Sequence, residues 1–174
     1  MKPISFSDKS ILFENKYFSL YSINVDFGDF SREYTVIRGK IRGGVVLEKK
    51  GAIMLVKQYR YAIDSYSWEL PSGGITAEEK LEDAVIRECL EETGIKCRNL
   101  THIFEYVVGV DVIDSPAHIF CSDDFEEVGD FDHKEIAEIK WVSYQECMNM
   151  IMSREIKDIF TIIGLFVYGF KYKH

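Results

Sequence analysis

The stretch from Glu69 to Ile95, ELPSGGITAEEKLEDAVIRECLEETGI, decides the fold because it contains the pattern of one amphipathic helix. Directly behind Arg87 it gathers three acids within one helical turn: Glu88, Glu91 and Glu92. At about 100° per residue, these acids share an arc with apolar residues of the preceding turns: Leu81, Ala84 and Val85. A solvated acidic face would lie opposite the apolar stripe, so we expect the three carboxylates to face the protein or a cleft.

Carboxylates that are gathered in a cleft repel one another. On an exposed helix like charges cost about 0.2–0.5 kcal/mol, whereas in a cleft each pair at about 6 Å costs roughly 3 kcal/mol. A divalent cation removes this repulsion, and oxygen ligands without nearby thiolate or imidazole favour Mg²⁺, with Mn²⁺ as the alternative. Taken alone, an E-x-x-E-E run is also compatible with a solvent-facing helix.

Composition and charge exclude several classes of protein. The chain has 174 residues, of which 47% are hydrophobic, and this predicts one globular domain. A net charge of -8 argues against a nucleic-acid partner and would also repel a small polyphosphate unless a cation were recruited. The N-terminal residues lack an apolar segment, which favours a cytoplasmic location. The apolar run 159–170 is shorter than the roughly 20 residues that a membrane span needs.

The order of predicted elements indicates a mixed α+β fold. Residues up to about 60 have β-strand patterns, with a hairpin turn at Lys49–Gly51, and 70–74 is expected to be a loop. Thr76 and Glu79 have the spacing of a capping box that opens the helix, and Gly94 is placed to end it. Strand patterns then return, and two helices are expected over 144–152 and 158–172.

The spacing around the acids resembles a known signature. Gly73 is followed after five residues by Glu79, and after seven more by the run 87–95, RECLEETGI. This resembles the Nudix hydrolase signature, G-x5-E-x7-R-E-U-x-E-E-x-G-U with U aliphatic. The one departure is Cys89 at an aliphatic position, and cysteine is itself a small hydrophobe.

The resemblance implies an αβα sandwich that hydrolyses a nucleoside diphosphate linked to another group. Within a single domain 1–174, it implies an N-terminal β subdomain over about 1–42 and a catalytic part over about 43–174. It makes Glu88, Glu91 and Glu92 metal ligands and has Arg87 orient their carboxylates. Glu79 would either support the site or serve only in the capping box.

Residues 51–74, GAIMLVKQYRYAIDSYSWELPSGG, resemble the ADP-ribose pyrophosphatase branch of that family. By this likeness Arg60 contacts substrate phosphate, and Glu69 and the carbonyl of Gly73 are further metal ligands. Arg60 as a surface charge and Glu69 as a turn-stabilising acid are the alternatives. In this branch the N-terminal strands commonly pair two protomers, so a homodimer is expected.

The substrate is less well specified than the family. Residues 108–110 (Val-Gly-Val) stand where ADP-ribose pyrophosphatases typically have a proline-containing turn, and Pro116 comes later. ADP-ribose is the leading substrate, while GDP-mannose or another nucleotide sugar is the alternative. A non-catalytic nucleotide-sugar-binding module is a further alternative, which the retained motif acids disfavour.

Two further assignments are open. Among the acids and histidine before the last strand, Glu135 is favoured as the general base over Asp132, His133 and Glu138, because of its position relative to Ile139–Trp141. Of the aromatic residues that are candidates to stack on a nucleobase, namely Tyr17, Phe18, Tyr59 and Tyr61, Phe18 is the one we assign to substrate binding. Most of these rings are expected to be core or interface residues.

Overall fold

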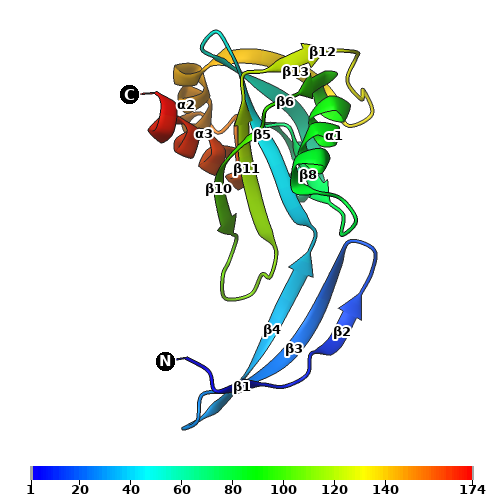
Figure 1. Cartoon of the computed structure of the whole chain (residues 1–174), viewed down its shortest axis with the longest axis vertical. Helices are drawn as coiled ribbons and strands as arrows, with labels where there is room; N and C mark the ends of the chain where they lie inside the picture. The colour runs from blue at the N-terminus through cyan, green and yellow to red at the C-terminus, as the bar shows by residue number, and fades with distance from the viewer. Residues whose placement is uncertain (1, 174) are drawn as a thin grey trace. The chain divides into compact units, whose positions relative to one another are not determined.

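The computed structural model describes residues 2–173, which form two compact units. The first unit consists of the described residues up to Ile41 together with Tyr106–Ala117. The second consists of Arg42–Glu105 and the described residues from His118 onward. Figure 1 shows the elements of both.

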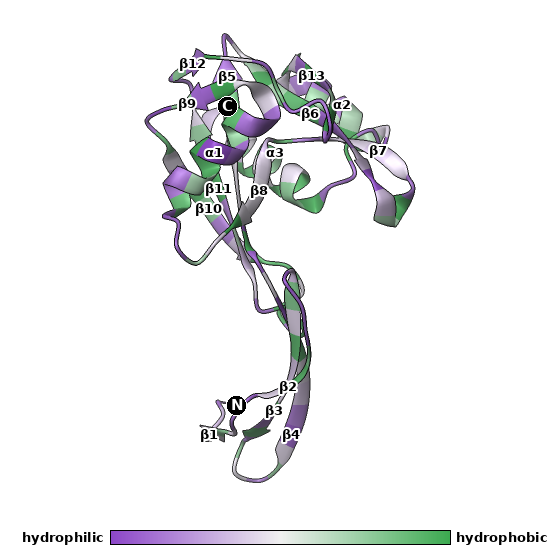
Figure 2. Ribbon diagram, turned by 90° about the vertical axis from the view of Figure 1, so that its right-hand side faces the viewer, coloured by the Kyte–Doolittle hydropathy of each residue, from purple (hydrophilic) through white to green (hydrophobic). Residues whose placement is uncertain are grey.

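The first unit is built on one antiparallel sheet. Its four strands are β1 (Ser5–Phe6), β2 (Ser10–Glu14), β3 (Phe18–Asp26) and β4 (Ser31–Gly39), and β3 pairs with each of the others. Tyr21 and Arg38 both donate hydrogen bonds to Asp114, which ties the segment 106–117 to this sheet. Hydrophilic and hydrophobic residues are mixed along these strands (Figure 2). Several large hydrophobic side chains are exposed here, including those of Phe6, Ile11 and Phe13.

A seven-stranded sheet, most of whose residues belong to the second unit, positions the candidate site. Five strands run in the order β10 (Thr101–Val107), β11 (Pro116–Ser122), β5 (Ile41–Lys49), β6 (Ala52–Arg60) and β13 (Ile136–Ser143). In addition, β7 (Ser65–Glu69) pairs with β6, and β8 (Ser72–Ile75) pairs with β5. A short 3-10 turn covers Tyr61–Ile63, and β9 (Ile95–Cys97) pairs with β12 (Phe125–Glu127).

Helices cover both faces of this sheet. Helix α1 (Leu81–Thr93) lies on one side, and α2 (Tyr144–Met152) and α3 (Ile159–Tyr172) lie on the other (Figure 1). Because both faces are covered, the central strands have continuous apolar runs, such as the fully buried Val45–Leu47 and Ile53–Val56. The predicted α+β fold is therefore confirmed.

Most predicted element ends agree with the structure. Helix α2 spans the expected 144–152, Asp158 caps α3, and Gly94 ends α1 in a left-handed conformation with φ of 70°. Helix α3 is only partly buried, because Phe166 and Phe170 are exposed. None of the helices described between residues 2 and 173 has the length and hydropathy needed to cross a membrane.

Two local predictions were wrong. Thr76 and Glu79 form a hydrogen-bonded turn, but the helix begins only at Leu81, because the backbone of Lys80 is extended. The expected loop 70–74 contains the start of strand β8. Pairing with β5 is possible because Gly44 lacks a side chain, and a Cβ there would overlap Ser72 and the carbonyl of Pro71.

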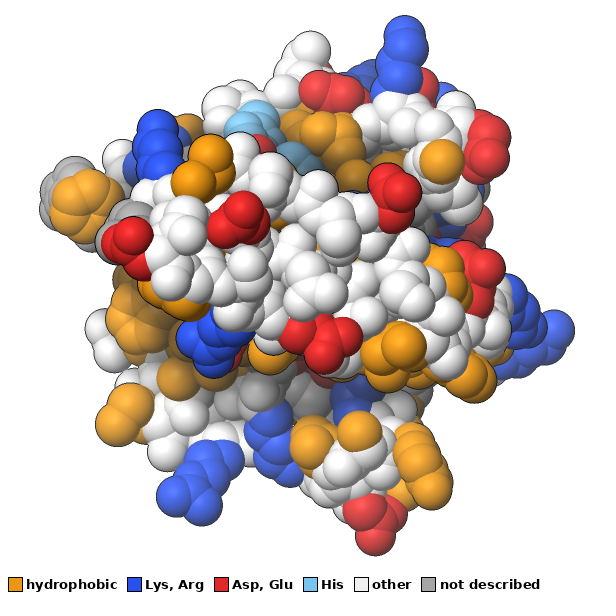
Figure 3. Space-filling view, turned by 90° about the horizontal axis from the view of Figure 1, so that it is seen from below, with side chains coloured by type: hydrophobic (Ala, Val, Ile, Leu, Met, Phe, Trp, Pro, Cys, Tyr) orange, Lys and Arg blue, Asp and Glu red, His pale blue; other side chains and the backbone are white. Residues whose placement is uncertain are grey.

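Figure 3 shows charged side chains of both signs beside hydrophobic ones on the face that it draws. All four cysteines are free thiols, and Cys89, Cys97 and Cys147 are buried. The fold is therefore held without cross-links among the described residues.

Candidate active site

A pocket of about 330 Å³ contains the three motif glutamates. Six acidic residues line it, together with the apolar side chains of Phe131 and Ile136. These acids are Glu88, Glu91, Glu92, Asp130, Asp132 and Glu135. We call this cavity the carboxylate pocket. It joins the predicted general base, Glu135, to the predicted metal ligands.

Backbone hydrogen bonds hold the loop 130–135 against the end of α1. The amide of Asp132 donates to the carbonyl of Glu91 at 2.9 Å, and the amide of Ile136 donates to the carbonyl of Asp132 at 2.9 Å. Because Ile136 opens strand β13, this loop is fixed at one end by the helix and at the other by the sheet. Glu135 is thereby carried to the motif acids although it is more than forty residues away in sequence.

Glu92 is the most buried of the motif acids, with an exposed fraction of 7%. Its carboxylate accepts hydrogen bonds from the amide of Ser72, at 2.8 Å, and from the side chain of Gln58. Burial raises the pKa of Glu92 to about 8, although these two hydrogen bonds oppose the shift. The negative charge of Glu88 adds to it. In the metal-free protein this carboxylate is therefore costly to ionise.

Glu88 lies against Gly73 of strand β8. A Cβ added to Gly73 would overlap the Glu88 carboxylate, so only glycine leaves room for it. Burial raises the pKa of Glu88 above its usual value, and the neighbouring Arg87 opposes this shift.

Arg87 connects three carboxylates. One guanidinium nitrogen donates to Glu88 at 2.8 Å and to Glu91 at 3.2 Å, while Nε donates to Glu79 at 2.7 Å. The hydrogen bond from Arg87 lowers the pKa of Glu79 to about 2. Glu79 thus supports Arg87 in addition to forming the turn with Thr76, and this turn precedes the helix and does not cap it.

A second pocket of about 510 Å³ contains the predicted phosphate contact, Arg60. It is also lined by Arg42, Lys157, Glu69 and Asp158, and we call it the arginine pocket. Glu69 is 1% exposed, and its two oxygens accept from Arg60 at 2.8 and 2.5 Å. Arg42 lies 3.4 Å from the same carboxylate and also pairs with Asp158 at 2.9 Å. Two arginines therefore converge on one buried acid.

Strand β8 connects the two pockets. The amide of Ser72 donates to Glu92, and the hydroxyl of Ser72 accepts from Arg42 at 2.9 Å. Gly73 lines the arginine pocket, yet its missing side chain makes room for Glu88. A single extended segment of the second unit thus has acids on one side and cations on the other.

The chemistry of the carboxylate pocket fits a hard divalent cation. Its side-chain donors are carboxylate oxygens, and none of the described residues that line it has a side-chain nitrogen or sulfur. The carbonyl of Gly73 as a further ligand stays a prediction. In the conformation described for residues 2–173, no three His, Cys, Asp or Glu side chains converge as a ready metal cluster. Arg87 instead pairs with Glu88 and Glu91.

The other predicted site residues are placed as follows. Asp132 lines the carboxylate pocket with Glu135, whereas His133 pairs with Asp130, and Glu138 pairs with Lys57 on β6. Phe18 lies in β3 of the first unit, where its ring is 5.6 Å from that of Phe13. Its role at a nucleobase stays a prediction.

Sequence reasoning missed several residues of the site: Gln58, Arg42, Lys157 and Asp158. Gln58 stands in the Q-Y-R run that was used only to place Arg60, and its position in that run was the available signal. In the structure its side chain contacts Glu92. Arg42 and Asp158 form an ion pair although they are 116 residues apart in the sequence, and no local sequence pattern predicts such a contact.

A family profile described as the NUDIX domain matches residues 38–160. A CMP-5'-(N-acetyl-N-hydroxy-3-aminopropyl)phosphonate hydrolase of Streptomyces rubellomurinus is 31% identical over 122 residues, or 70% of this chain. That match spans only 59% of the relative's length. An ADP-ribose pyrophosphatase of Bacillus subtilis is 27% identical over 162 residues, covering 90% of this chain and 88% of that protein.

A solved structure, described as the crystal structure of an ADP compounds hydrolase, has the same fold. Its TM-score to this chain is 0.83, with 20% sequence identity, and the match covers 99% of this chain and 95% of the other. The two-unit chain is thus matched over nearly its whole length.

Proposed function

Because the chain belongs to the Nudix hydrolase family, we propose that it hydrolyses the diphosphate bond of a nucleoside diphosphate sugar, with ADP-ribose as the leading substrate. The products would be a nucleoside monophosphate and a sugar phosphate. The observation that carries this proposal is the pairing of an acidic pocket and a cationic pocket across β8. The cationic side suits a diphosphate, and the acidic side suits the ions that accompany it.

Divalent metal ions are general in this family, and for this chain we propose Mg²⁺, with Mn²⁺ as the alternative. Glu88, Glu91, Glu92 and the carbonyl of Gly73 would hold the ion. The chemistry that a bound divalent ion supplies is neutralisation of the diphosphate and a lower pKa of the attacking water. For Glu69, the ion pairs with Arg60 and Arg42 support the alternative role of an acid that holds these arginines.

The remaining steps fall to side chains of this chain. Arg60, Arg42 and Lys157 bind the oxygens of the diphosphate, since guanidinium groups match such oxygens in pairs. Glu135 accepts the proton of the attacking water, because its carboxylate lines the pocket that holds the motif acids. Arg87 keeps the carboxylates of Glu88 and Glu91 oriented.

A second candidate is another nucleotide sugar, such as GDP-mannose. Residues 108–110 lack the proline-containing turn of ADP-ribose pyrophosphatases, and the two relatives described above are named for different nucleotides, CMP and ADP. A non-catalytic binding module is disfavoured because all three motif acids are retained.

The test is a substrate panel with Mg²⁺. ADP-ribose, GDP-mannose, ADP-glucose, UDP-glucose and a dinucleoside polyphosphate would each be incubated with the protein, and released monophosphate would be measured. We expect the highest kcat/KM for ADP-ribose. A higher value for GDP-mannose would select the second candidate, and binding without release of monophosphate would select the binding module.

The first unit would pair two protomers. Its exposed hydrophobic side chains support this homodimer, with Phe6 64% and Ile11 55% exposed. Equilibrium sedimentation should give about twice the 20.2 kDa mass of the chain, and a single species at that chain mass would refute the dimer. A reducing cytoplasm is the proposed location, since all four cysteines are free thiols.

A further inference from the structure

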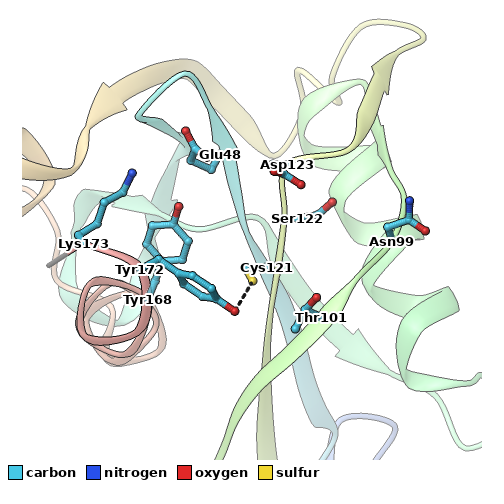
Figure 4. Close-up of a pocket in the computed structure, with 9 residues that line it drawn as sticks. All are labelled: Glu48, Asn99, Thr101, Cys121, Ser122, Asp123, Tyr168, Tyr172 and Lys173. Atoms are coloured by element: carbon cyan, nitrogen blue, oxygen red, sulfur yellow. Dashed lines mark hydrogen bonds between the residues drawn. The ribbon is translucent and has the colours of Figure 1, made fainter.

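A separate cavity of about 280 Å³ lies at the C-terminal end of α3 (Figure 4). We call it the α3-end pocket. Its lining includes Tyr168 and Tyr172 from α3, Glu48 from β5 and Cys121 from β11. None of its lining residues belongs to the carboxylate pocket or the arginine pocket. The proposed hydrolysis therefore leaves this cavity unexplained.

Tyr168 is the first sign that the α3-end pocket is built for a ligand. The residue is only 5% exposed, yet its hydroxyl faces the cavity and has no hydrogen-bond partner among residues 2–173. Its neighbour Tyr172 differs, because the Tyr172 hydroxyl accepts from the thiol of Cys121 at 3.7 Å. The hydroxyl is open to the cavity and is not enclosed by protein, so a bound molecule can reach it and hydrogen-bond to it.

The charge of the α3-end pocket selects the kind of ligand. Glu48 and Asp123 both line it, and neither forms an ion pair within the part of the chain that the structure describes. One oxygen of Glu48 accepts from the amide of Gly51, which fixes the carboxylate in place. The only basic lining residue is Lys173, so acids outnumber bases. A phosphate-bearing nucleotide would be repelled from such a cavity.

The aromatic rings of the α3-end pocket also favour a positively charged ligand. The rings of Tyr168 and Tyr172 lie with centroids 5.2 Å apart, and the ammonium of Lys173 lies 5.7 Å from the Tyr168 ring centroid. Aromatic faces beside carboxylates form an environment that attracts organic cations. Lys173 itself shows that an ammonium group is accepted at this ring.

We propose that the α3-end pocket binds a small organic ammonium ion, through the carboxylates of Glu48 and Asp123, the tyrosine rings and the hydroxyl of Tyr168. The ammonium donates to the carboxylates and to the Tyr168 oxygen, and it displaces the ammonium of Lys173 from the ring. A cavity of this size suits a molecule smaller than a nucleotide, such as a short aliphatic diamine. This site is distinct from the site proposed for hydrolysis.

The probe is putrescine, a four-carbon diamine, titrated into the full chain by calorimetry without nucleotide. We expect saturable binding that Glu48→Gln weakens about tenfold, because a charge-assisted contact is lost. Tyr168→Phe should weaken it about threefold to fivefold through loss of the hydroxyl. Lys173→Ala should instead tighten binding, because a competing ammonium is removed.

Matched controls make this test decisive. Glu82→Gln removes the same charge from an exposed position on α1 and should change the affinity by less than about twofold. The proposal is overturned if putrescine shows no saturable binding, or if Glu82→Gln weakens binding as much as Glu48→Gln. Preferential binding of inorganic phosphate, with loss of binding in Lys173→Ala, would also overturn it. Because no turnover is measured, failure here is independent of failure of the hydrolase proposal.

Discussion

The carboxylate pocket and the arginine pocket lie on two sides of β8, and their lining residues differ in charge. In the carboxylate pocket six acids line the cavity, and Arg87 pairs with only two of them, Glu88 and Glu91. In the arginine pocket two arginines share one buried acid, Glu69, and Lys157 adds a third positive charge. One pocket therefore lacks positive charge, and the other can accept more negative charge.

This difference in charge indicates which kind of ligand each pocket can bind. Glu92 remains hard to ionise until a cation arrives, because it is buried and close to Glu88. The arginines are already ordered by Glu69, so they can bind an anion without first losing much side-chain freedom. The proposed substrate, a metal-bound diphosphate, would supply both partners at once.

The largest effect should come from removing the central acid of the carboxylate pocket. We expect Glu92→Gln to lower kcat by about 10³-fold or more, on the scale of losing a member of a catalytic group. Folding should be retained, because glutamine can still accept from Ser72. Steady-state kinetics with Mg²⁺ would measure this, with Glu82→Gln as the control. Turnover within a few-fold of wild type would show that the acidic pocket is not where the reaction occurs.

Crowding the boundary between the pockets should have the next largest effect. In Gly73→Ala the new Cβ overlaps the Glu88 carboxylate, which is the flexible end of a side chain and can swing away. We therefore expect activity to fall about 10- to 100-fold, as when the support of a metal ligand is lost. The melting temperature should change little. Gly129→Ala is the control, because a Cβ there meets nothing within 4 Å. Equal activity of the two variants would contradict the proposed place of Glu88.

Weakening the arginine pocket should affect binding more than chemistry. Arg60→Gln removes a bidentate partner of Glu69, so we expect KM to rise about tenfold while kcat changes less. Stability should fall by about 1–3 kcal/mol, since Glu69 is buried but keeps Arg42 as a partner. Kinetics and urea unfolding would be measured on the same samples. A fall in kcat with unchanged KM would assign Arg60 to the chemical step.

The smallest predicted effect concerns stability and pH in the metal-free protein. Glu92 has a folded pKa of about 8, above the value in an unfolded chain, so the native state binds its proton more tightly. The corresponding stabilisation is present at low pH and is lost as the pH rises through 8. Because glutamine does not ionise, the stability of Glu92→Gln relative to wild type should rise by an amount on the order of a few kcal/mol between about pH 5 and pH 9. Urea unfolding with a chelator measures the difference, and a difference independent of pH would contradict the shifted pKa.

The sequence was most informative where function depends on local spacing. The run 87–95 allowed the family to be predicted, residues 51–74 allowed its branch to be predicted, and both are confirmed. The buried position of Glu92 and the partly buried position of Glu88 agree with the helical arc, whereas Glu91 is exposed because it sits at the edge of that arc.

Contacts between residues far apart in the sequence could not be predicted from local spacing. The strand character of 72–75 depends on Gly44 in β5, and a glycine-rich segment by itself indicates a loop. Likewise, Arg42 acquires its role only when α3 brings Asp158 beside it. Glu135 could be favoured from its place before the last strand, but its approach to Glu91 depends on a backbone contact of Asp132.

The narrow space at Gly73 also has a genetic consequence. Every missense change of a glycine codon introduces a residue with a Cβ, so no single amino-acid replacement at this position leaves the Glu88 carboxylate where it is. Since the clash is with a movable side chain, the altered proteins would still accumulate in the cell as folded but impaired enzyme. Selection on catalysis, rather than on solubility or expression, would therefore remove such alleles.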